Sequence, residues 1–219
     1  VPDVPDVKHP SVPDVVTPVF GANANVSGQE KASGHELAAL IPALAEEVRK
    51  ANVRLVIISA LNDGADCASA GKLLLDDVMA AGMRVGVVDA ASAVVSEKPG
   101  ISDLAADMVE FGEIVFSSAE GDLFEVYWGT LPEIAPDSEK PLTLIKALGD
   151  ICELVVVFAG RADAKAGLAL FAGAEAALVL VAGAPIDEAQ KTAAINAAKS
   201  LGFERYRLVA APAQKTNVA

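Results

Sequence analysis

From residue 53 onward, short apolar runs alternate with longer amphipathic stretches, and this alternation limits the fold more than any other feature. The runs are rich in Val, Ile and Leu and have the length of buried strands, whereas the stretches between them have the apolar period of helices. Strands separated by helices of ten or more residues form right-handed βαβ units. We therefore predict an α/β fold: a doubly wound, mostly parallel sheet flanked by helices in three layers.

The expected strands cover residues 54–59, 84–89, 123–128, 153–158, 176–181 and 206–211. Helices are expected over residues 68–81, 101–109, 138–148 and 164–172, from about residue 33, and from Pro185 to Gly202. Pro42 interrupts the first of these patterns, so that helix is expected to start later or to be kinked. Ligands of such sheets bind at the carboxyl ends of the strands, so the loops that follow the strands are where a functional site is expected.

The chain is expected to contain one folded domain, over residues 33–213, followed by a tail over residues 214–219. Residues 1–32 are rich in Pro and Asp and repeat Val-Pro-Asp three times. Regularly placed prolines favour an extended, semi-rigid spacer. We interpret this segment as a linker, either a disordered tail or a tether between a membrane segment and the domain.

The chain is strongly acidic, with 30 Asp and Glu against 17 Lys and Arg and a net charge of −13. Such a surface repels phosphate backbones and anionic lipid, so we expect no nucleic-acid partner. The two Cys and two His have no spacing that suits a metal or redox motif, and we expect neither a metal nor a cofactor. No signal peptide or run of about 20 apolar residues is present, so membrane attachment is expected only through a segment outside this chain.

The loop after the first strand, SALNDGADCASA over residues 59–70, lies where a phosphate-binding loop would be. Such a loop follows the pattern G-x-x-x-x-G-K-[ST], in which backbone N–H groups and the Lys hold the phosphates. Around the Gly71-Lys72 pair, Asp66 stands where the first Gly should be and Leu73 where the Ser or Thr should be. The motif is therefore absent.

The order and spacing of several segments nevertheless carry a resemblance to a family. Residues 59–61 (SAL), 80–85 (AAGMRV), 87–90 (VVDA) and 100–104 (GISDL) match it in turn, and the likeness extends over residues 35–212. The chain resembles the cytoplasmic domain of bacterial tyrosine kinases of the exopolysaccharide co-polymerase family, which are related to the MinD/ParA ATPases. The resemblance implies a P-loop NTPase-like sandwich.

The chain departs from the family where the family's chemistry lies. Asp66 stands in place of the Lys and Cys67 in place of the Mg²⁺-binding Ser or Thr, while Asp63 and Ala65 replace glycines. In the second acidic motif Asp89 is kept but Ala91 replaces the second Asp, and Phe158 replaces the metal-directing Asp of the third strand. We predict no catalytic residue, but a vestigial phosphate loop (Ser59, Asn62, Asp63, Gly64, Ala65, Asp66 and Cys67) and a vestigial acidic motif (Asp89).

Among single side chains, Asp66 and Asp89 are a candidate carboxylate pair, although solvated loop acids are the more frequent case. Cys67 is expected to be an inert thiol. Tyr127 and Trp128 are interpreted as core packing rather than as a contact surface. Lys191, Lys199, Arg205 and Arg207 are interpreted as a solvated face rather than as an interface.

These observations favour a non-catalytic pseudo-kinase or pseudo-ATPase domain of a polysaccharide co-polymerase, on the cytoplasmic side of the bacterial inner membrane. The resemblance implies self-association and protein partners in a polysaccharide synthesis or export complex. One alternative is an active ATPase or tyrosine kinase whose atypical loop holds a cation through Asp63, Asp66 or Asp89. Others are a free-standing ParA-like module and a doubly wound domain with another ligand.

Overall fold

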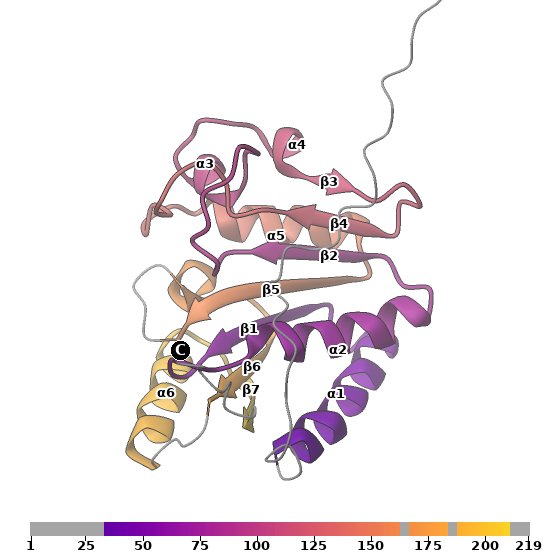
Figure 1. Cartoon of the computed structure of the whole chain (residues 1–219), viewed down its shortest axis with the longest axis vertical. Coiled ribbons are helices and arrows are strands. Elements are labelled where there is room, and N and C mark those ends of the chain that lie inside the picture. The colour runs from indigo at the N-terminus through magenta and orange to yellow at the C-terminus, as the bar shows by residue number, and fades with distance from the viewer. Residues whose placement is uncertain (1–32, 163–166, 184–187, 211–219) are drawn as a thin grey trace, which may run out of the picture.

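The computed structural model describes residues 33–162, 167–183 and 188–210, which form one α/β unit around a seven-stranded sheet (Figure 1). The strands are β1 (Leu55–Ala60), β2 (Val85–Asp89), β3 (Phe116–Ser117), β4 (Leu123–Val126), β5 (Leu154–Arg161), β6 (Ala177–Ala182) and β7 (Arg205–Ala210). The helices are α1 (Ser33–Arg49), α2 (Cys67–Ala80), α3 (Ile101–Ala105), α4 (Phe111–Ile114), α5 (Lys140–Ile151), the 3₁₀ helix η1 (Leu168–Phe171) and α6 (Glu188–Ser200).

The sheet has the order β3-β4-β2-β5-β1-β6-β7, and its pairs are parallel except for β3 with β4. This arrangement confirms the predicted fold class. The chain passes from β1 over β5 to reach β2, and later returns to β6 on the other side of β1. The carboxyl ends of β1 and β5 therefore lie at the middle of the sheet, where such folds have their ligand crevice.

Helices cover both faces of the sheet because its central strands are apolar on both sides. Val56, Ile58 and Val156 point into a core layer with α1 and α2. Ile57 and Val157 point into the opposite layer, which also receives side chains of α3, α5, η1 and α6. Figure 1 shows α1 and α2 together beside one part of the sheet, with α6 apart from them. The strand alternation thus divides the interior into two layers, as expected for three-layer packing.

Several expected elements differ from those observed. The first helix runs through Pro42 without a break. The helix expected over residues 101–109 ends at Ala105. Of the helix expected over 164–172, the described residues 167–172 form a 3₁₀ turn over Leu168–Phe171. The antiparallel strand β3 was not predicted, because it has only two residues and shows no alternation. Other ends differ by one to three residues, which is the usual uncertainty of helix and strand ends read from sequence.

Some expectations lie outside the described residues: the linker over residues 1–32, the tail over 214–219 and the helix start at Pro185. Within the described part of the chain, no helix combines the length and apolar character needed to cross a membrane.

Candidate functional site

The candidate site is the carboxyl edge of the sheet around the loop of residues 61–66, which connects β1 to α2. Because β1 lies between β5 and β6, this loop leaves the sheet between the ends of two neighbouring strands. A phosphate-binding loop would have this position, with its backbone N–H groups facing a ligand. The arrangement of the loop's side chains decides whether a nucleotide could be held there.

On the β6 side, the loop is joined to the strand end by backbone and side-chain hydrogen bonds. Leu61 N donates to Val181 O at 2.8 Å. The Asn62 amide then pairs with Gly183 in both directions: Nδ2 donates to Gly183 O at 3.1 Å and Gly183 N donates to Oδ1 at 2.7 Å. A Cβ at Gly183 would lie 2.6 Å from Gly64 C, so the two backbones approach as closely as only glycine allows.

On the β5 side, the same loop is joined to the strand by an ion pair. Arg161, the last residue of β5, binds the carboxylate of Asp63. The side chains are 41% and 91% exposed, so this pair contributes less than about 1 kcal/mol. Just before the loop, Ser59 Oγ donates to Gly160 O at 2.9 Å. The loop is thus tied to both strands that flank β1.

Asp66, which the sequence resemblance aligns with a Lys, is the N-cap of α2. Ser69 N donates to its Oδ1 at 2.9 Å, and Ser69 Oγ donates to its Oδ2 at 2.6 Å. The free N–H groups of a helix N-terminus are what a bound phosphate would accept from. Here the chain's own carboxylate accepts a hydrogen bond from one of these N–H groups, that of Ser69, and places a negative charge at the helix N-terminus. The sequence signal was available, because Asp directly before a helical pattern is a preferred N-cap.

Cys67 begins α2 and is partly buried against the core layer of α1 and α2. Burial, and secondly the carboxylate of Asp66, raise the pKa of this thiol to about 12. The thiol therefore stays protonated near neutral pH and is a poor nucleophile and metal ligand. This agrees with the expectation of an inert cysteine.

Asp89, at the end of β2, accepts hydrogen bonds from the loop that follows it. Its Oδ1 accepts hydrogen bonds from Ala91 N at 3.0 Å and Ser92 N at 2.8 Å, as in an Asx turn. Asp66 and Asp89 both lie at the carboxyl edge, but each has a separate set of partners. The described residues contain no group of three or more acidic, His or Cys side chains placed to hold a metal ion.

Phe158 lies inside β5, paired with Ile58 on one side and Asp89 on the other. The sequence placed it at the end of its strand, which is wrong, because β5 continues for three more residues to Arg161. Its ring is 4% exposed and packs against α2 at Gly71, where an added Cβ would lie 2.2 Å from Cζ. An aromatic ring therefore fills the space between β5 and α2 at Gly71.

The other singled-out residues have structural partners. Trp128 is buried and its Nε1 donates to Leu131 O at 2.7 Å, while the Tyr127 ring lies 4.6 Å from Lys98 Nζ. The basic residues near the end of the described chain contact Glu188 (Lys191), the Tyr206 ring (Lys199), Asn52 O (Arg205) and Glu47 (Arg207). These contacts favour the core interpretation for Trp128 and the solvated-face interpretation for the basic residues, whereas Tyr127 is only partly buried.

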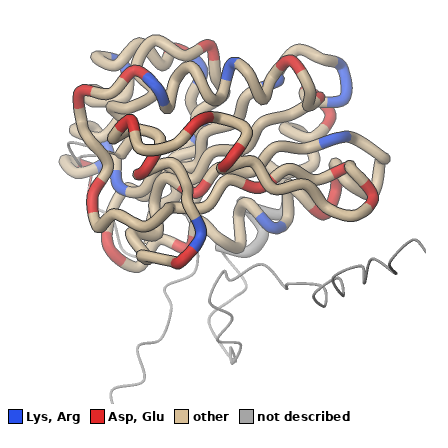
Figure 2. The backbone as a smooth tube through the Cα atoms, turned by 90° about the horizontal axis from the view of Figure 1, so that it is seen from above, with Lys and Arg blue, Asp and Glu red and all other residues tan. Residues whose placement is uncertain are grey.

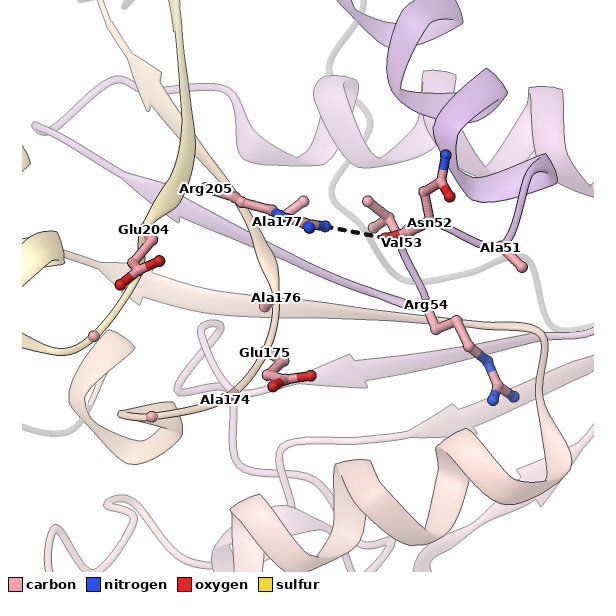
Figure 3. A pocket seen from close by; sticks show the side chains of 12 residues that line it. Ala51, Asn52, Val53, Arg54, Ala174, Glu175, Ala176, Ala177, Glu204 and Arg205 are labelled. Atoms are coloured by element: carbon pink, nitrogen blue, oxygen red, sulfur yellow. Dashed lines mark hydrogen bonds between the residues drawn. The ribbon is translucent and has the colours of Figure 1, made fainter.

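Sequence reasoning missed a hollow at the opposite edge of the sheet, with a volume of about 620 Å³. It lies between the turns of residues 51–54, 173–177 and 202–205, at the amino ends of β1, β6 and β7. Figure 3 shows the Arg205 side chain reaching toward Asn52, whose carbonyl oxygen accepts its hydrogen bond. The side chains of Glu175 and Glu204 also line the hollow. No motif marks these turns, because backbone forms much of the wall.

No family model and no curated protein matches the sequence. Solved structures match its fold. The BceF tyrosine kinase domain has a TM-score of 0.65 at 19% identity, over 80% of this chain and 76% of that one. The kinase domain of the Escherichia coli tyrosine kinase ETK has a TM-score of 0.68 at 14% identity, over 91% and 86%. The MinC:MinD cell division complex of Aquifex aeolicus has a TM-score of 0.56 at 13% identity, over 72% and 68%.

These matches cover most of the described sheet and helices, so they compare whole domains and not a shared fragment. The chain therefore has the P-loop NTPase-like fold that bacterial tyrosine kinase domains share with MinD-type proteins.

Proposed function

We propose that this chain is a non-catalytic, pseudo-kinase or pseudo-ATPase domain that acts through protein–protein contacts in a polysaccharide synthesis or export complex. The observation that carries the proposal is the cap of α2: the Asp66 carboxylate occupies the helix N-terminus where a phosphate group would bind. The assignment to exopolysaccharide biosynthesis, chain length or export rests on the sequence resemblance and on the kinase domains with the same fold.

Electrostatics supports the absence of nucleotide binding. A phosphate oxygen about 4 Å from the Asp66 carboxylate would be repelled by about 4 kcal/mol at an effective dielectric near 20. The loop of residues 61–66 contains no lysine that could offset this repulsion. Figure 2 shows Asp and Glu distributed over the whole body of the domain, with fewer Lys and Arg between them. The general field of the domain therefore also opposes a triphosphate.

Packing supports the same conclusion independently of charge. The resemblance aligns Phe158 with the metal-directing carboxylate, and its ring is buried against α2 at Gly71. Phosphoryl transfer depends on a positioned metal ion and on donors that stabilise the transferred group. The apolar ring supplies neither. A single substitution at Asp66 would therefore leave the site without metal-directing chemistry.

The first test is phosphate release and tyrosine phosphorylation by the purified protein with Mg-ATP, beside an intact bacterial tyrosine kinase domain. We expect both signals to equal those of a blank without protein, and millimolar ATP to leave the thermal midpoint unchanged. Clear phosphate release would disprove the proposal. An ATP-induced shift of the wild-type midpoint would also contradict it. A shift that appears only in Asp66→Ala, compared with that variant's own ATP-free midpoint, would support the blocking role of the carboxylate.

The second test concerns the biological role. Deleting the segment that encodes this domain from its parent gene is expected to change the amount or chain length of cell-surface polysaccharide. The wild-type domain and an Asp89→Ala variant should restore it equally, because the proposed role needs no nucleotide chemistry. Unchanged polysaccharide after the deletion would reject the proposed role.

A further inference from the structure

We propose that the loop of residues 61–66 is held closed by an intramolecular latch, formed by Asn62 with Gly183 and by Asp63 with Arg161. The latch replaces the contacts that a bound nucleotide would make, so the loop has its ordered conformation without any ligand. This inference rests on the proposed non-catalytic function. It identifies how the vestigial site is regulated: the loop is released when the contacts of the latch are broken.

The two halves of the latch lie on opposite sides of the loop. Asn62 binds the end of β6 and Asp63 binds the end of β5, the two strands that flank β1. Two consecutive residues therefore fix the loop to both neighbours of its own strand. In nucleotide switches, the ligand orders a segment by bridging such elements, and loss of the ligand releases it. Here side chains provide the bridge.

The close approach of Gly183 to the loop makes this closed state specific. A Cβ at Gly183 would meet Gly64 C at 2.6 Å, Gly64 O at 2.7 Å and Ala65 N at 2.9 Å. These are backbone atoms that cannot rotate away, so the loop would have to move. Gly183→Ala is thus a second route to opening the loop without touching Asn62.

The two contacts differ in strength. The Asn62 pair comprises two partly buried hydrogen bonds, whose removal is expected to favour the open loop about tenfold. The ion pair is exposed and is expected to contribute only a few-fold. Asn62 is therefore the main element of the latch, and Arg161 is the accessory one.

The chain contains its own reporter of loop opening. Cys67 directly follows the loop and is partly buried, whereas Cys152, the only other cysteine, is buried in the opposite core layer. Because Cys67 is covalently continuous with the loop, we expect opening of the loop to expose its thiol and to lower its pKa from about 12 toward an ordinary value. Cys152 reacts only when the domain opens more widely, and so serves as the internal control.

The experiment measures alkylation of each cysteine by iodoacetamide at about pH 8, resolved by peptide mass spectrometry. We expect Asn62→Ala and Gly183→Ala each to accelerate Cys67 modification about tenfold and Arg161→Ala a few-fold. The Cys152 rate should stay unchanged, and Lys72→Ala, which breaks an exposed ion pair on α2, should change neither rate. Wild-type Cys67 rates in all three latch variants would overturn the latch. Equal acceleration of both cysteines would also overturn it, since the effect would then be global destabilisation.

A nucleotide arm separates this inference from the proposed function. With Mg-ATP present, the Cys67 rate of the wild-type protein is expected to remain unchanged. Slowing by ATP, together with acceleration by Asn62→Ala, would refute the non-catalytic proposal and leave the latch in place. No response to either ATP or the latch variants would refute the latch and leave the proposed function in place.

Discussion

Gly71 and Phe158 are in contact, and this contact limits which side chains each of the two positions can hold. The ring packs so closely on α2 that residue 71 has no space for a side chain. Glycine in the interior of a helix costs about 1 kcal/mol relative to alanine, which the packing of the ring offsets. Because each residue suits the other, a carboxylate at position 158 would leave an unpaired charge against the core.

We expect Gly71→Ala to lower the free energy of unfolding by about 1–3 kcal/mol, because the added Cβ would overpack the core against Phe158. Gly149→Ala in α5 is the control: no atom lies within 4 Å of its added Cβ, so it should be neutral or stabilise by up to about 1 kcal/mol. Equilibrium urea unfolding measures both. The loss at residue 71 should shrink in a Phe158→Leu background, and equal effects of the two glycine substitutions would contradict the steric explanation.

At the scale of elements, α3 shows how a short helix is fixed by one buried carboxylate. Five residues are too few for a helix to be stable alone. Asp103 accepts hydrogen bonds from Gly100 N at 2.8 Å, from Thr130 N at 2.9 Å and from Thr130 Oγ1. Burial raises the pKa of Asp103, but these hydrogen bonds outweigh burial and hold its pKa below the ordinary value. The ionised side chain thus joins α3 to the segment after β4.

This lowered pKa predicts a pH dependence of stability. Above the unfolded pKa of about 4, Asp103 is ionised in both states and its stabilising contribution is fully present. As the pH falls through the lower folded pKa, the unfolded state binds the proton first and the contribution is lost. We expect wild-type stability to fall more steeply than that of Asp103→Asn as the pH drops through and below about 4, measured by urea unfolding. Asp150→Asn, which removes an exposed carboxylate, is the charge control, and parallel curves for wild type and Asp103→Asn would contradict the prediction.

At the scale of the whole molecule, the sheet separates two core layers, and the two cysteines lie in different ones. Cys67 packs with α1 and α2, whereas Cys152 belongs to the layer of α3, α5, η1 and α6. A disulfide requires Cα atoms within about 7 Å, which is not compatible with cysteines on opposite faces of a sheet. The fold therefore excludes an internal redox switch between them.

We accordingly expect the thermal midpoint to be the same under oxidising and reducing conditions, measured by calorimetry at a concentration low enough to avoid intermolecular bridges. When the folded protein is oxidised and its mass is then measured after unfolding, both thiols should still be free. An internal bridge, seen as a loss of two hydrogens, would contradict the arrangement of the two layers.

The sequence by itself determined the fold class, because strand and helix periods are local patterns that survive without tertiary information. It also predicted which loop follows the first strand, since the order of segments fixes that, and the structure places residues 61–66 between β1 and α2. Boundaries were less predictable. The 3₁₀ turn η1, the two-residue β3 and the path of α1 through Pro42 depend on packing against other elements.

What only the tertiary structure decided is how the vestigial site is filled. Asn62 and Gly183 are 121 residues apart, and Asp63 and Arg161 are 98 apart, so no local pattern indicates either contact. The ring of Phe158 meets Gly71 only because β5 passes under α2. The sequence predicts which catalytic groups are missing, since that is a matter of residue identity once the resemblance is accepted. Structure showed what stands in their place, because contacts between distant segments exist only after the sheet has formed.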